Sequence, residues 1–114
     1  MKKYLCIFFC IIHFFLFATS GTWNTTTGGN WTDTGNWAGG TVPNAIDDDA
    51  TFNTAFVANT TINLDQDITL GALDVDLTAA AGPFTIDSSQ LVFRTSSGNA
   101  SCTVTNPGGL DFTV

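Results

Sequence analysis

Short apolar-x-apolar triplets recur in pairs along the second half of the chain, and this pattern limits the fold more than any other feature. The three pairs are residues 62–64 with 68–70, 84–86 with 91–93, and 102–104 with 110–112. Successive first triplets start 22 and 18 residues apart, and successive second triplets start 23 and 19 residues apart. Alternation with period 2, bounded by short polar turns, predicts β-strands that bury one face.

Self-similarity at about twenty residues is typical of solenoids. One repeat cannot bury its apolar face alone, whereas stacked repeats bury a continuous column. We therefore predict an all-β fold, a parallel β-helix of about three rungs over residues 50–114. The alternating stretch 73–77 is assigned to the first connection, with Gly71 and Ala72 marking a bend. The alternative is an antiparallel β-sandwich, whose short strands also come at regular spacing.

The first twenty residues differ in composition from the rest. Two lysines precede an apolar run over residues 4–17, and residues 18–20 place small side chains at positions −3 and −1 of a cut before Gly21. This is the layout of a secretory signal peptide, and the run is shorter than the ~20 residues of a permanent transmembrane helix. We predict cleavage between Ser20 and Gly21 by the export machinery, which leaves no transmembrane segment in the mature chain.

Removal of this segment leaves an acidic chain with little catalytic potential. Arg94 is then the one basic residue against ten aspartates, a formal charge of −9, and no Glu, Lys or His remains. Such a surface repels nucleic acid and anionic lipid. No base is left to activate a hydroxyl nucleophile, so we predict no enzyme and no catalytic residues. Asp65 with Asp67, and Asp74 with Asp76, could serve a glycosidase, but such strand pairs share an outward face and are expected to be solvated.

Neither metal nor cofactor is expected. Asp47, Asp48 and Asp49 offer oxygen ligands for Ca²⁺, but they lack the spacing of an EF-hand, so a turn into the first strand is the prediction. Transition-metal sites need His or a cluster of Cys. Cys102 lies in a strand pattern and is expected to be buried as a small apolar residue, with an intermolecular disulfide as the alternative.

Residues 21–49 are rich in Trp, Gly and Asn and contain few aliphatic side chains. The sequence Gly-Asn-Trp occurs twice, ending at Trp31 and at Trp37, and Trp23 precedes both. Three indole rings can cover a large apolar area. We predict that this segment caps the open end of the first rung. The alternative is a carbohydrate-binding β module in which Trp23, Trp31 and Trp37 stack on sugar rings.

A longer motif extends through this segment into the first strand. Its residues are Trp23, Gly29-Asn30-Trp31, Asn36-Trp37, Gly39-Gly40, Pro43-Asn44, Asp49-Ala50 and Phe52. The motif resembles the start of bacterial proteins with autotransporter-associated β-strand repeats, and residues 62–73 resemble the recurrent rung of that family. The resemblance implies a right-handed parallel β-helix passenger domain, exposed at the cell surface or released from it.

Together these features predict the N-terminal part of a longer exported bacterial protein, truncated at its C-terminus. Its parts are a signal peptide (1–20), a cap (21–49) and rungs (50–114). The expected role is structural or adhesive, toward a surface receptor or polysaccharide, with a secreted, cell-surface or outer-membrane location. The competing classes are the carbohydrate-binding module and a pectate-lyase-like enzyme, for which Arg94 alone is thin support.

Overall fold

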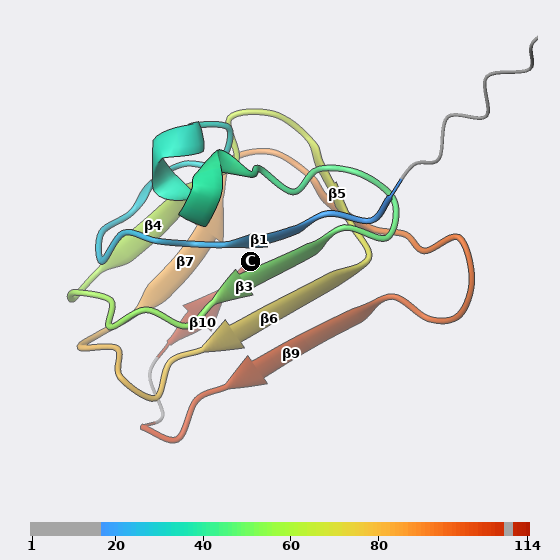
Figure 1. Ribbon diagram of the computed structural model, residues 1–114. Coiled ribbons are helices and arrows are strands. Elements are labelled where there is room, and N and C mark those ends of the chain that lie inside the picture. Colours follow the sequence, from blue (N-terminus) through green and yellow to red (C-terminus); the bar gives the residue numbers. More distant parts are fainter. Residues whose placement is uncertain (1–16, 109–110) are drawn as a thin grey trace, which may run out of the picture.

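The computed structural model describes residues 17–108 and 111–114, which form an all-β fold of short strands (Figure 1). The strands are β1 (Ser20–Thr22), β2 (Gly29–Asn30), β3 (Asp49–Phe52), β4 (Thr60–Asn63), β5 (Ile68–Leu70), β6 (Ala72–Asp76), β7 (Phe84–Asp87), β8 (Leu91–Phe93), β9 (Ser101–Thr105) and β10 (Phe112–Thr113). Two 3₁₀ turns, η1 (Thr34–Asn36) and η2 (Ala38–Gly40), follow β2. The apolar run of the predicted signal peptide lies outside the described residues, apart from Phe17.

None of the helical segments in the described part of the chain is long and apolar enough to cross a membrane.

The ten strands form three sheets in which all pairing between named strands is parallel. The strand orders are β1-β3-β6-β9, β10-β7-β4-β2 and β5-β8. From β3 onward the chain visits the first, second and third sheet in turn and then returns to the first. Asp49 pairs with Ala72, and Ala72 pairs with Ser101. The antiparallel sandwich is therefore wrong as a description of the strand pairing.

One part of the predicted repeat is also wrong. The sequence pattern aligned residues 102–104 with 84–86, but β9 pairs with β6, so that Cys102 lies opposite Leu73, and β10 takes the place beside β7. Residues 73–77 are therefore not a connection, since most of them belong to β6, a strand of the first sheet. The predicted bend at Gly71 explains this. A Cβ at Gly71 would lie 2.7 Å from Asp47 Cα. Because glycine has no Cβ, the two backbones can approach this closely, and the chain turns between β5 and β6 within one residue.

The other predicted triplets lie where the alternation places them. Residues 68–70 and 91–93 are β5 and β8, with Ile68 opposite Leu91. Residues 84–86 lie in β7, and Ile86 pairs with Ile62 of β4. β1 and β2 were not predicted, and β3 begins at Asp49, inside the segment expected to form the cap.

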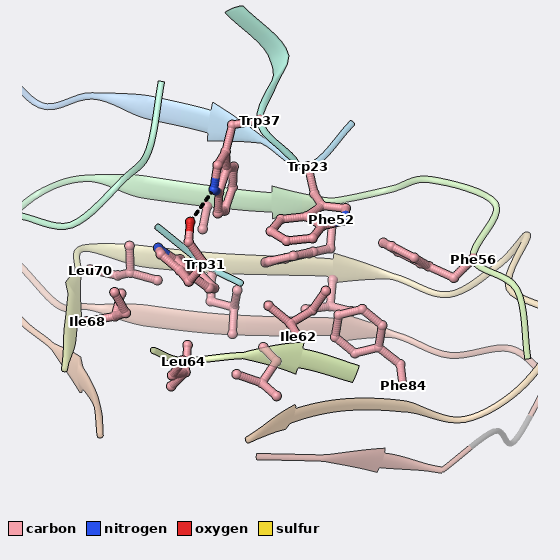
Figure 2. Packing of buried hydrophobic residues seen from close by; sticks show 14 of the residues in the cluster. Trp23, Trp31, Trp37, Phe52, Phe56, Ile62, Leu64, Ile68, Leu70 and Phe84 are labelled. Carbon is pink, nitrogen blue, oxygen red and sulfur yellow. Dashed lines mark hydrogen bonds between the residues drawn. The ribbon is translucent and has the colours of Figure 1, made fainter. Parts of the chain in front are cut away.

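Alternate side chains of the sheets point into one apolar cluster (Figure 2). Its large, nearly inaccessible members are Trp23, Trp31, Trp37, Phe52, Phe56, Ile62, Leu64, Ile68, Leu70, Leu73, Leu77 and Phe84. In parallel, in-register pairing, a residue that faces inward on one strand pairs with a residue that faces inward on the next strand. Apolar side chains therefore stack on apolar side chains. The cluster is therefore continuous from β1 and β2 toward β7.

Burial ends at β9, the last strand of the first sheet. All five of its residues are exposed, and Val104 keeps 37 % of its surface accessible. Cys102 is exposed as well, so the prediction that it is buried is wrong. The physical reason is position, since no described strand lies beyond β9 to cover its inward face.

Candidate functional site

The three tryptophans converge at the edge of the fold formed by β1 and β2. Trp23 follows β1 directly, Trp31 follows β2 directly, and Trp37 lies between η1 and η2. Trp23 and Trp37 form an isolated antiparallel bridge. The ring centroids of Trp37 lie 5.1 Å from those of Trp23 and 4.9 Å from those of Trp31, in edge-to-face geometry. The two Gly-Asn-Trp sequences thus bring their indoles into one cluster.

Every indole in this cluster has its N–H group satisfied by a main-chain carbonyl. Trp31 Nε1 donates to the carbonyl of Pro43 at 2.9 Å, and Trp37 Nε1 donates to the carbonyl of Trp31 at 2.7 Å (Figure 2). Trp23 Nε1 donates to the carbonyl of Thr27 at 3.3 Å. The exposed fractions of the three side chains are only 0–2 %. A sugar therefore has no access to the ring faces in this conformation.

Phe52 on β3 lies against the inner side of the tryptophan cluster. Its ring centroid is 5.5 Å from that of Trp23 and 5.6 Å from those of Trp31 and Trp37. On its other side it lies 5.5 Å from Phe84 of β7. Because β1 and β2 are the outermost strands of their sheets, the indoles lie where the sequence predicts a cap.

The outward face of the second sheet presents two ladders of small polar side chains. We call this surface the Thr/Asn face, and its members are Thr61, Thr85 and Thr113 in one ladder and Asn30, Asn63 and Asp87 in the other. Neighbouring strands place the members of a ladder ~4.8 Å apart. Asn63 Nδ2 donates a hydrogen bond to Asn30 Oδ1 at 2.8 Å, which fixes both amides. The result is a regular surface of hydroxyl and amide groups with one carboxylate, that of Asp87.

Two of the candidate aspartates, Asp65 and Asp76, accept hydrogen bonds that favour their ionised form. The hydroxyl of Thr32 donates to Asp65 and holds the pKa of that carboxyl below its usual 3.8. The side chain of Thr78 lowers the pKa of Asp76 in the same way. Each of these carboxylates also accepts a main-chain N–H, from Thr32 at 3.1 Å and from Thr78 at 2.9 Å. The two aspartates therefore stabilise loops.

The remaining aspartates named as candidates lie apart from one another. Asp67 accepts the N–H of Gln90 at 3.1 Å, and Asp74 is exposed on the outward face of β6. Asp65 and Asp67 thus accept hydrogen bonds from different segments of the chain, at Thr32 and at Gln90. Within residues 17–108 and 111–114 no pocket is found, and no group of three or more His, Cys, Asp or Glu side chains is placed to hold a metal.

The acidic triplet forms the predicted turn into β3, and its three side chains have different environments. Asp47 has a φ of 69°, and its carboxylate accepts the N–H of Ser96 at 2.8 Å. The Ser96 side chain, followed by this N–H, lowers the pKa of Asp47. Asp49 is exposed on the outward face of β3. Asp48 is only 4 % exposed, and nothing in the sequence distinguishes it from its neighbours.

Ser20 and Gly21, the predicted cleavage pair, both lie in β1. Ser20 pairs with Asp49 and Gly21 with Ala50. Cleavage between them stays a prediction. The structure adds that Thr19, which the prediction assigns to the signal peptide, is hydrogen-bonded to the fold through both its N–H and its carbonyl group.

Comparison with protein-family models, with curated proteins and with solved structures found no match for this chain.

Proposed function

We propose that this chain is an exported bacterial surface protein, and that its described part is a right-handed parallel β-helix with a structural or adhesive role. The observation that carries the proposal is the in-register parallel stacking of like residues, which builds a polar ladder outside and an apolar column inside. The motif that runs from Trp23 to Phe52 supports the same family of passenger domains.

The order in which the chain visits its sheets supports the β-helix. Three strands, one from each sheet, make up a turn, and the next turn stacks on it: β3-β4-β5 is followed by β6-β7-β8, and β9-β10 begins another. β1 and β2 supply two sides of an earlier turn. This gives about three rungs behind the tryptophan cluster. Parallel crossovers are almost always right-handed in proteins, which favours that hand here.

The Thr/Asn face supports an adhesive role. Hydroxyl and amide groups both donate and accept hydrogen bonds, so a regular array of them suits a partner rich in hydroxyls, such as a polysaccharide or a glycan-bearing surface receptor. Ten aspartates against Arg94 disfavour polyanionic partners. The alternative carbohydrate module, which uses Trp23, Trp31 and Trp37, has no support from their burial.

Two steps test the proposal in a bacterium that produces the full chain with its own N-terminus. Brief protease treatment of intact cells should remove the chain if it is displayed, and culture supernatant should contain it if it is released. Purified exported protein is then tested for binding to polysaccharide-coated beads, with Thr61→Asp and Thr85→Asp as variants on the Thr/Asn face.

Matched controls place the same substitution on the neighbouring sheet, as Thr22→Asp and Thr103→Asp. Both positions are exposed, as Thr61 is, whereas Thr85 is half-buried. The proposal expects binding that is weakened by the first pair of variants and unchanged by the second. A chain that stays in the cytoplasm contradicts export. Equal loss of binding in both pairs contradicts the Thr/Asn face as the adhesive surface.

A further inference from the structure

We propose that the mature chain begins at Thr19 and that its new α-amino group forms an ion pair with the buried carboxylate of Asp48. The proposal rests on the export proposed above, because it needs the leader to be removed. It places the cut two residues before the bond that the small-residue pattern favours, and it gives Asp48 a cationic partner.

Asp48 is a buried carboxylate whose hydrogen bonds come from the main chain. Its Oδ1 accepts the N–H of Thr19 at 2.7 Å, and its Oδ2 accepts the N–H of Asn44 at 3.0 Å. The residue is 4 % exposed. Burying a carboxylate is costly unless it is paired and hydrogen-bonded. The one basic side chain among the described residues, Arg94, is exposed.

Thr19 is held to the fold through its carbonyl group as well as its N–H. Its carbonyl accepts the N–H of Asp49 at 2.9 Å, and the parallel ladder with β3 continues from Ser20. Upstream, Ala18 is exposed and Phe17 keeps 82 % of its surface accessible. The bond between Ala18 and Thr19 therefore lies next to two exposed side chains.

Hydrolysis of the bond between Ala18 and Thr19 creates a positively charged α-amino group beside the Asp48 carboxylate. The signal peptidase of the exporting cell uses one water, leaving a carboxylate on Ala18 and an amino group on Thr19, which takes up a proton at neutral pH. The nitrogen already lies 2.7 Å from Asp48 Oδ1, so the ammonium needs no movement to bind it. A charge-assisted hydrogen bond is roughly twice as strong as a neutral one. Ala18 is also a suitable small residue at position −1.

A cut between Ser20 and Gly21 would have the opposite effect on Asp48. It would remove the Thr19 N–H from Oδ1 and the Thr19 carbonyl from the N–H of Asp49. The carboxylate would stay buried with one donor. The small-residue pattern favours this later bond, since the earlier cut places a leucine at position −3. The small-residue pattern therefore favours cleavage after Ser20, whereas the contact of Thr19 with Asp48 favours cleavage after Ala18. The N-terminal residue of the exported protein decides between the two sites.

The first test is the intact mass of the full chain after export from a bacterial host. A protein that begins at Thr19 supports the proposal, and one that begins at Gly21 overturns it while leaving export intact. Uncut precursor in the cytoplasm would instead contradict export itself. Ser20→Leu separates the two bonds further, because it blocks position −1 of the later cut only. We expect this variant to be processed as the wild type is, and loss of processing would overturn the proposal.

The second test addresses the ion pair in the exported protein. With Lys2 and Lys3 removed, the chain has no lysine, so the α-amino group is its sole primary amine. Amine-selective acetylation then keeps an N–H on Thr19 but removes the charge. We expect acetylation to lower the folding equilibrium constant about tenfold in urea titrations, and to have little effect in Asp48→Asn.

An equal effect of acetylation in wild type and Asp48→Asn would overturn the ion pair. If Asp48→Asn does not fold, the acetylation rate gives an independent measurement in the wild-type protein. An ammonium bound to a buried carboxylate should react more slowly in the native protein than in urea. Equal rates under the two conditions would contradict the contact.

Discussion

Phe52→Ala should remove a quarter or more of the stability of the described fold, about 4–5 kcal/mol out of ~5–15 kcal/mol. The Phe52 side chain is fully buried, and its ring centroid lies 5.5–5.6 Å from those of three indoles and Phe84. Truncation of a buried Phe costs ~3–5 kcal/mol, and the aromatic pairs that are lost place this site at the upper end, about 4–5 kcal/mol. A small domain has only ~5–15 kcal/mol of stability in total. The milder Phe52→Leu should cost about 1–2 kcal/mol and lower the melting temperature by about 4–8 °C per kcal/mol.

Urea unfolding followed by tryptophan fluorescence measures this effect directly, because all three tryptophans contact Phe52. Phe93 on β8 provides a matched control, since it is 37 % exposed. Phe93→Leu should cost well under half as much as Phe52→Leu. The reasoning is refuted if Phe52→Leu leaves the free energy of unfolding unchanged, or if Phe93→Leu costs as much.

Four further predictions follow from the same contacts. Trp31→Ala should cost about 3–5 kcal/mol and unfold or aggregate the protein; a variant that melts like the wild type but loses glycan binding would support the carbohydrate module instead. Gly71→Ala should destabilise by about 1–3 kcal/mol in a urea titration, because the added Cβ meets the Asp47 backbone at 2.7 Å; wild-type stability would show that the corner is not tight. Asp65 has its pKa lowered by Thr32, so its ionised form favours folding above pH 3.8, and this contribution is lost as the pH falls below 3.8. Asp65→Asn should therefore flatten the acid limb of a melting-temperature profile. Melting midpoints with and without EDTA should agree, since a metal bound only by the native state would raise the midpoint.

Most of the strands from β4 onward were predictable from the sequence because their signal is local, whereas β1 and β2 were not. Alternation within five residues identifies β4 to β8, and the same alternation identifies β9. The pairing was less predictable, because residues 73–77 and 102–104 carry the same kind of pattern as 62–64. The choice between partners depends on the contact of Gly71 with Asp47, which brings together residues 24 apart. For the same reason the exposure of Cys102 could not be read from its own triplet, since it depends on what lies beyond β9.

At the candidate sites, the sequence predicts which residue types matter but not what they contact. Three tryptophans among few aliphatic residues indicate an apolar cluster, and their burial agrees with this. The acidic triplet is different, because Asp47, Asp48 and Asp49 are chemically identical. Only the long-range contact of Asp48 with Thr19, 29 residues away, separates the buried carboxylate from the half-buried Asp47 and the exposed Asp49. No local pattern contains that information.

The hydrogen bonds of the indole N–H groups explain why tryptophan occurs among the many Gly and Asn residues of 21–49. A segment rich in Gly and Asn folds as irregular loops, whose main-chain carbonyls lack the partners that a sheet provides. Aliphatic side chains could cover the apolar column below but could donate no hydrogen bond. An indole does both, since its rings pack on Phe52 while its N–H satisfies a loop carbonyl, as Trp31 does for Pro43 and Trp37 for Trp31. Tryptophan spaced by Gly and Asn is therefore a composition suited to closing the end of a stacked β structure. Phe in place of Trp37 would keep an aromatic ring, but the smaller side chain would leave part of the space empty and the Trp31 carbonyl without its donor.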